Sequence, residues 1–146
     1  MRLASKPPAL AVLALLLLLP LGLVRAQTPG PGVEDVRAAS EPIMRQLEAF
    51  RRGDFDAAYA FASEEIRGRF DRAQFEAMVR GGYPEIARSV FAAVADGERA
   101  SNGNVYLVVK IRGANGVSIE AVYEMVSEAG AWKINGVVTK PDAGAV

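Results

Sequence analysis

The sequence predicts an α+β domain in which N-terminal helices pack on a four-stranded antiparallel meander sheet. Apolar residues recur with a helical period up to about Tyr83, and they alternate as in strands from there to about Lys140. Three turn signals divide the second half: the Asn-Gly pairs at 102–103 and 115–116 and the pair Ala129-Gly130. Helices followed by consecutive hairpins are typical of an antiparallel sheet covered on one face.

Residues 1–26 have the pattern of a secretory signal peptide. Arg2 and Lys6 precede the uncharged run 9–24, and Val24-Arg25-Ala26 fits a cleavage site. As a helix this run would span roughly 24 Å, less than the ~30 Å hydrocarbon core of a bilayer. We therefore favour a cleaved signal over the alternative, a retained anchor. The expected mature protein is periplasmic or secreted, with no stable membrane span.

Residues 27–32 are predicted to be a linker because they contain two Pro-Gly pairs, which disfavour regular structure. The predicted domain covers residues 33–140, and residues 141–146 form a tail. The first helix is expected to begin at about Glu41 and to end at Gly53. Whether residues 34–39 add helix before a kink stays open. The buried stripe of this helix is expected to contain Ile43, Leu47 and Phe50.

Three shorter helices are expected to follow, with Asp54, Ser63 and Asp71 as their N-caps. Gly81-Gly82 is expected to stop the last of them, and Tyr83-Pro84 to end the helical part of the chain.

The strands are expected at about 88–97, 104–112, 117–127 and 131–139. The first two turns suit three-residue loops that end with a glycine in the left-handed region. This loop length places the apolar residues of the second and third strands on one face. The resulting pairs include Val105 with Met125, Leu107 with Tyr123, Val109 with Ala121, Ile111 with Ile119 and, on the other face, Lys110 with Glu120.

Ala129-Gly130 is predicted to form a two-residue loop, because only that length keeps the apolar residues of both strands on one face. The expected pairs are Met125 with Ile134, Tyr123 with Gly136 and Ala121 with Val138. The same reasoning places Phe91, Ala93 and Ala95 on the inner face of the first strand. The inner strand positions then contain no acidic residue, and Glu120 and Glu124 lie on the outer face.

Composition excludes several kinds of protein. The chain has 146 residues, enough for one domain, with 51% hydrophobic residues and 17 Lys and Arg against 17 Asp and Glu. Balanced charge argues against a nucleic-acid-binding protein. The sequence contains no His and no Cys, which removes the commonest general base, the commonest metal ligand and thiol chemistry. We predict no catalytic residues, no metal site and no cofactor.

Short motifs along almost the whole predicted domain resemble those of a known family. They are Gln46-Leu47, Ala49-Phe50, the run from Ala58 to Ser63, Phe75 with Met78-Val79, Tyr83-Pro84, Tyr123 with Met125, and Trp132 with Ile134 and Gly136. The chain resembles the nuclear transport factor 2-like superfamily and, within it, a bacterial domain-of-unknown-function family, number 4864. The resemblance implies a cone-shaped fold with a curved sheet, and it implies no activity.

Four aromatic residues are candidates for binding a ligand: Tyr59, Tyr83, Tyr123 and Trp132. Phenol and indole groups that line a cavity offer apolar surface together with a hydrogen-bonding atom. The alternative is that all four are ordinary residues of the amphipathic core. The predicted function is non-catalytic binding of a small apolar ligand or of a protein partner. One alternative is a small proton-transfer enzyme, of the isomerase, dehydratase or cyclase type, and another is a structural accessory domain.

The outer face of the sheet is a candidate homodimer surface. The predicted registers place Val108, Val122 and Val137 in one row, with Tyr106 beside them. A row of apolar residues on a face that should meet water suggests a partner surface. The alternative is a set of ordinary exposed valines.

Overall fold

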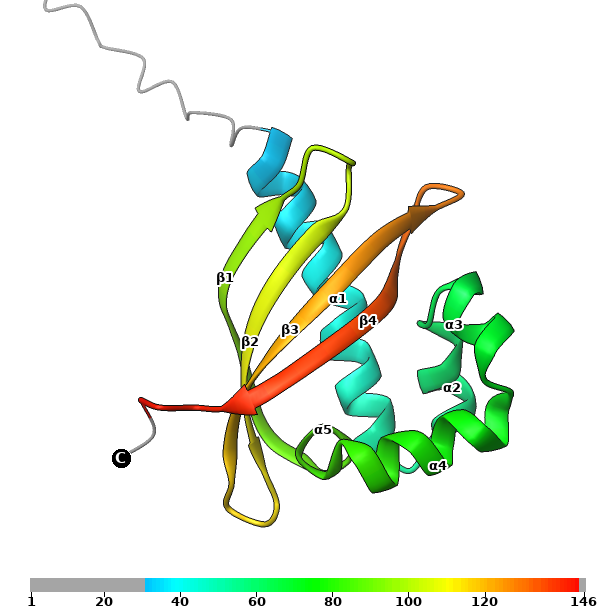
Figure 1. The fold of residues 1–146 in the computed structure, drawn as a ribbon, viewed down its shortest axis with the longest axis vertical. Coiled ribbons are helices and arrows are strands. Elements are labelled where there is room, and N and C mark those ends of the chain that lie inside the picture. The colour runs from blue at the N-terminus through cyan, green and yellow to red at the C-terminus, as the bar shows by residue number, and fades with distance from the viewer. Residues whose placement is uncertain (1–30, 145–146) are drawn as a thin grey trace, which may run out of the picture.

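The computed structural model describes residues 31–144, so the predicted signal peptide and linker residues 27–30 lie outside the described residues. Within the described residues, five helices precede four strands, and the sheet order β1-β2-β3-β4 is antiparallel throughout (Figure 1). The predicted α+β meander is confirmed. The elements are α1 (Pro31–Arg51), α2 (Phe55–Ala60), α3 (Glu64–Arg69), α4 (Arg72–Gly82), α5 (Pro84–Ala87), β1 (Ser89–Arg99), β2 (Val105–Gly113), β3 (Ser118–Glu128) and β4 (Ala131–Pro141).

Helix α1 crosses one face of the curved sheet, and α2, α3 and α4 gather beside β4 (Figure 1). Ile43, Leu47 and Phe50 of α1 are buried at helical spacing, as predicted. The helix is continuous from Pro31, so the open question about residues 34–39 is settled in favour of helix, and Pro42 lies inside it. The predicted linker was wrong for Pro31 and Gly32. Proline suits the first turn of a helix, where its missing N–H has no helical partner to lose.

The predicted N-caps are confirmed. Asp54 accepts from the backbone N of Ala57 at 3.0 Å, Ser63 from Ile66 at 3.2 Å and Asp71 from Gln74 at 2.8 Å.

The predicted stop of α4 at Gly81-Gly82 is confirmed, because Gly82 is the last residue of the helix. Tyr83-Pro84 does not end the helical part of the chain, because Pro84 begins the short helix α5.

The predicted register of β2 and β3 is confirmed along its length, including Val105 opposite Met125 and Lys110 opposite Glu120. The loop glycines Gly103 and Gly116 have φ of 90° and 82°, the left-handed region that these loops require. Ala129 and Gly130 both have positive φ, 47° and 79°, and Glu128 faces Ala131, as a two-residue turn requires.

The register of β3 and β4 holds at Met125 opposite Ile134 and then shifts by one residue at a β-bulge. Asn135 is the additional residue, so Gly136 faces Glu124, and Tyr123 faces Val137. The predicted pairs of Tyr123 with Gly136 and of Ala121 with Val138 were therefore wrong. Val137 packs against the core on the helix-covered face, which corrects its predicted place on the outer face, and Val138 lies opposite Val122 with 73% exposure.

Strand β1 carries two further irregularities, between Ser89 and Phe91 and between Val94 and Asp96. Ala92 and Val94 take the positions opposite the buried Ile111 and Val109. The predicted inner positions Phe91, Ala93 and Ala95 were wrong, and Phe91 is 57% exposed. A bulge adds one residue and exchanges the two faces of a strand beyond it, which alternation of residue type alone does not reveal.

Candidate functional site

A cavity of about 290 Å³ lies between the helices and the sheet. Its walls come from α1, α3, α4, α5 and the middle of β3 and β4. Most of the lining side chains are aliphatic or aromatic. The lining residues are Gln46, Phe50, Ala62, Ile66, Arg69, Phe70, Phe75, Met78, Val79, Tyr83, Ile86, Tyr123, Ile134, Asn135, Gly136 and Val137.

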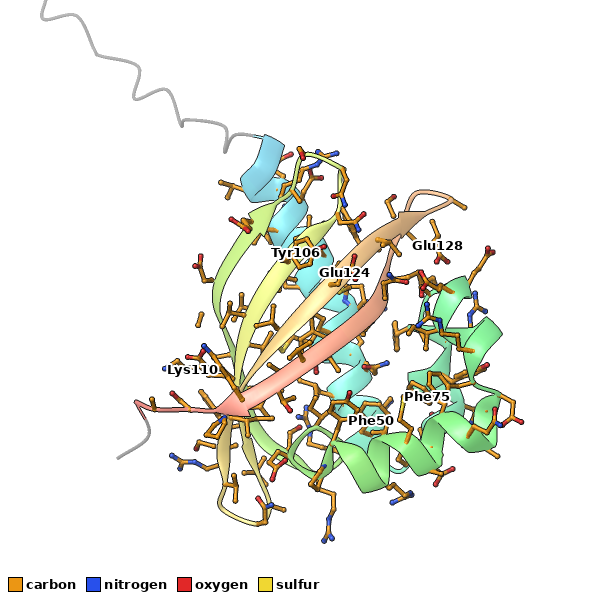
Figure 2. All side chains as sticks on the ribbon, in the orientation of Figure 1. Phe50, Phe75, Tyr106, Lys110, Glu124 and Glu128 are labelled. Atoms are coloured by element: carbon orange, nitrogen blue, oxygen red, sulfur yellow. The ribbon has the colours of Figure 1, made fainter. Side chains whose placement is uncertain are left out.

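Aromatic packing builds the helical wall of this cavity. Phe50 of α1 and Phe75 of α4 are both buried, and their ring centroids lie 6.1 Å apart at an interplanar angle of 28°. Figure 2 shows both rings on the helical side of the sheet. Phe55 joins them, at 5.2 Å from Phe50, and Arg80 covers the Phe55 ring at 4.3 Å. This wall is therefore apolar and firmly packed.

Tyr123 lines the cavity from the sheet side and carries an unsatisfied polar atom. Tyr123 is 1% exposed, and its hydroxyl has no hydrogen-bond partner among the described residues. Burial raises the pKa of this phenol well above its ordinary value because the charged form would be desolvated. At neutral pH the hydroxyl therefore keeps its proton and remains a donor without an acceptor.

Gln46 and Asn135 also line the cavity, and sequence reasoning identified neither as a site residue. Gln46 is 4% exposed, and its Nε2 donates to the carbonyl oxygen of Ala58 at 3.0 Å. Asn135 accepts at Oδ1 from the Ser63 hydroxyl at 2.7 Å. The position of Asn135 depends on the bulge in β4, and the only sequence signal for that bulge is Gly136, two residues after a buried strand position. For Gln46, the available sequence signal was its position next to Leu47 on the buried side of α1.

The carboxylate of Glu124 lies on the face of the sheet away from the helices, as predicted, and it contacts the bulge. Its Oε2 accepts from Asn135 Nδ2 at 3.4 Å, and its Oε1 accepts from Asn104 Nδ2 at 2.8 Å and from the Tyr106 hydroxyl at 3.2 Å. Figure 2 shows Tyr106 and Glu124 next to each other on the sheet. The negative charge of Glu124 raises the pKa of Tyr106.

The predicted neighbours Lys110 and Glu120 face each other across β2 and β3 and pair with other residues. Lys110 Nζ lies 3.3 Å from Asp142, and Lys140 Nζ lies 3.0 Å from Glu120. The pKa of Asp142 is lowered, first by the hydrogen bond from the backbone N of Gly144 and then by Lys110. These charges lie on the outer face, away from the cavity.

The structure brings two of the four predicted ligand-binding residues together, because Tyr83 and Tyr123 both line the cavity. Tyr59 lies outside the lining. Its hydroxyl donates to the carbonyl oxygen of Phe70 at 2.6 Å, which ties α2 to the segment between α3 and α4. Trp132 lines a separate shallow groove with Pro42 and other residues. A ligand-binding role for any of the four stays a prediction.

The described part of the chain, residues 31–144, contains no cluster of three or more acidic, His or Cys residues placed to hold a metal ion. Within the same residues, no helix has both the length and the apolar character needed to cross a membrane.

A family model described as Domain of unknown function (DUF4864) matches residues 34–145. Among solved structures, an NTF-2 like protein of unknown function from Silicibacter pomeroyi is similar, with a TM-score of 0.55 and 18% identity over 75% of this chain and 98% of the other. Aln2 from a Streptomyces species has a TM-score of 0.51 and 17% identity over 79% of this chain and 94% of its own. At such identities the likeness concerns the fold alone. No curated protein matches the chain.

Proposed function

The chain belongs to the DUF4864 family and has the nuclear transport factor 2-like fold, and from this basis we propose that it binds a small, mostly apolar ligand between its helices and its sheet. One observation carries the proposal: a cavity of about 290 Å³ with aromatic walls is lined by Tyr123, whose hydroxyl is buried and unpartnered among the described residues. This volume suits a small molecule rather than a peptide.

The energetics of the hydroxyl support a ligand. Leaving a buried donor without a partner costs about 1–3 kcal/mol, and a phenylalanine at this position would avoid that cost. A ligand with one polar atom near Tyr123 would recover it. The alternative of a proton-transfer enzyme would have to use the titratable groups of the lining, which are Tyr83, Tyr123 and Arg69. No specific observation favours that chemistry over binding.

Titration of the full-length protein with naphthalene, followed by calorimetry, tests the proposal. We expect saturable binding of one naphthalene per chain. Met78→Trp should abolish it, because Met78 lines the cavity and indole is larger than the thioether chain. Met44→Trp is the matched control, since Met44 lies in a separate surface groove beside β1. Absence of binding to the wild type, or equal binding to both variants, would overturn the proposal.

Export and self-association remain parts of the same proposal. The signal pattern of residues 1–26 supports a periplasmic or secreted protein. The outer face of the sheet supports a homodimer, because Val108 and Val122 are half-buried there and Val138 is 73% exposed beside Val122. Val138 takes the place in this row that was expected for Val137, and Tyr106 lies on the same face. A second copy is the proposed partner.

A further inference from the structure

The charge of the cavity lining indicates which chemical class the ligand belongs to. Among the described residues, Arg69 is the only charged residue that lines the cavity, so the lining carries a positive charge and no negative one. We infer that the cavity selects a small apolar carboxylic acid, with its hydrocarbon body between the helices and the sheet and its carboxylate on the Arg69 guanidinium. This inference rests on the proposed function, because it specifies the ligand of the same cavity.

The spacing of residues along α3 places Arg69 on the side of the helix that meets the cavity. Ile66, Arg69 and Phe70 are spaced i, i+3 and i+4, which puts them on one side of the helix, and all three belong to the lining. Arg67 precedes Arg69 by two residues, which puts it on the opposite side of α3, and it is not part of the lining.

Hydrogen bonds at both ends hold α3 in this orientation. At the N-terminal end, the backbone N of Ser63 donates to the carbonyl oxygen of Ile134 at 2.9 Å, and the Ser63 hydroxyl donates to Asn135 Oδ1 at 2.7 Å. At the C-terminal end, the carbonyl oxygen of Phe70 accepts from the Tyr59 hydroxyl at 2.6 Å. Turning Arg69 away from the cavity by rotating the helix would therefore break contacts to both β4 and α2.

The exposure of Arg69 places it where the cavity opens to water. Its side chain is 65% exposed, whereas Phe75 and Val79 of the same lining are each 4% exposed. A carboxylate held at this opening stays partly hydrated, so the ligand avoids the large cost of burying a charge. Only the apolar part of the ligand then enters the space between the aromatic wall and the sheet.

The Arg69 guanidinium has donors left for a ligand carboxylate. Its Nη2 donates to Glu65 Oε1 at 2.5 Å, and its Nε and Nη1 have no acceptor among the described residues. Arginine commonly binds a carboxylate through two parallel N–H groups. The Glu65 side chain is 54% exposed, and ion pairs between such exposed groups are weak. Glu65 is therefore a weak competitor for Arg69 that a bound ligand would meet.

Calorimetric titration of the full-length protein with naphthoate and naphthamide at low salt tests the inference. The two probes, substituted at the same ring position, have nearly the same shape, and only naphthoate is charged at neutral pH. We expect the wild type to bind naphthoate about fivefold more tightly than naphthamide. Arg69→Gln should lower this ratio to about one while its affinity for naphthamide stays within about twofold of the wild type. Higher salt should narrow the ratio of the wild type.

Two further variants separate Arg69 from a general effect of charge. Glu65→Gln removes the competing carboxylate and should raise the affinity for naphthoate by about twofold to threefold. Arg67→Gln is the matched control, because it removes the same charge from the other side of α3 and should leave the ratio within about twofold of the wild type.

Equal affinity of the wild type for both probes, or an equal ratio in Arg69→Gln and Arg67→Gln, would overturn the inference and leave the proposed function standing. Wild-type affinity of Met78→Trp for naphthoate would also overturn it, because the anion would then bind arginines outside the cavity. Absence of binding for naphthalene, naphthoate and naphthamide would overturn the proposed function and the inference together.

Discussion

Removing the hydroxyl of Tyr123 should make the ligand-free protein more stable. The side chain is 1% exposed, and its oxygen has no partner among the described residues. Tyr123→Phe deletes that single atom and leaves the ring in the same packing. Most substitutions in a protein core destabilise, so the expected sign is unusual and distinguishes this account from generic core damage.

The size of this stabilisation follows from two opposing contributions. Removing a buried unpaired polar group recovers about 1–3 kcal/mol, and the space left by the oxygen costs a small part of that in lost packing. We therefore expect the free energy of unfolding to rise by about 1 kcal/mol, which corresponds to about 4 °C in Tm for a domain of this size. Urea denaturation followed by circular dichroism measures it, with the m-value expected to stay unchanged.

Tyr59→Phe is the matched control because it is the same chemical change at a satisfied hydroxyl. The Tyr59 hydroxyl donates to the carbonyl oxygen of Phe70 at 2.6 Å. Its loss should lower the free energy of unfolding by about 0.5–1.5 kcal/mol. Destabilisation of Tyr123→Phe by an amount similar to that of Tyr59→Phe would refute the reasoning, since it would mean that the Tyr123 hydroxyl is already satisfied.

Alkaline pH gives a second signature of the same group. The pKa of Tyr123 is raised in the folded protein, whereas the unfolded chain releases the proton near the ordinary value of about 10. Above that pH the folded state holds more protons than the unfolded state, so stability falls as pH rises. The wild type should lose up to about 1.4 kcal/mol per pH unit more than Tyr123→Phe. Parallel stability curves above pH 10 would contradict this expectation.

Three other predictions concern packing, association and export. Gly113→Ala should lower the free energy of unfolding by about 1–3 kcal/mol, because the new Cβ would lie 3.0 Å from the Cα of Glu85. Gly81→Ala should raise the free energy of unfolding by about 0.5–1 kcal/mol, because nothing lies within 4 Å of the new Cβ and alanine suits a helix better than glycine. Thermal unfolding measures both variants, and equal effects would contradict both predictions. Val122→Lys should convert a dimer to a monomer in sedimentation, and a monomeric wild type would argue against the outer face. Intact-mass measurement of the exported protein should show a chain that starts at Gln27, whereas a mass that includes residues 1–26 would exclude cleavage.

Most of the fold was predictable because its signals are local. Each helix cap needs only a side chain and a backbone N–H three residues later, and Asp54, Ser63 and Asp71 all behave in this way. The register of β2 and β3 followed from one loop length and one alternating pattern. The start of α1 at Pro31 was missed because proline and glycine were interpreted as breakers where proline suits a helix start, and residues 34–39 were left open.

The candidate site was predicted less completely because it depends on the bulges and on tertiary packing. Tyr83 and Tyr123 were identified, but Asn135 was not, since only the register shift beside Glu124 brings it to the cavity. Tyr59 had the same appearance in the sequence as Tyr123. The two hydroxyls differ only in the fold, because that of Tyr59 donates to the carbonyl oxygen of Phe70, eleven residues further along the chain.

The two edges of the sheet also bear on how this protein avoids aggregation. An edge strand offers unpaired N–H and C=O groups to any other strand it meets, which is a route to aggregation. The β4 edge is interrupted by the backbone bonds between Ile134 and residues 61–63, and the β1 edge, which exposes Val90 and Phe91, is interrupted by its two irregularities. Strand-to-strand growth of the sheet into fibres is therefore disfavoured at both ends, even though β1 is long and partly apolar.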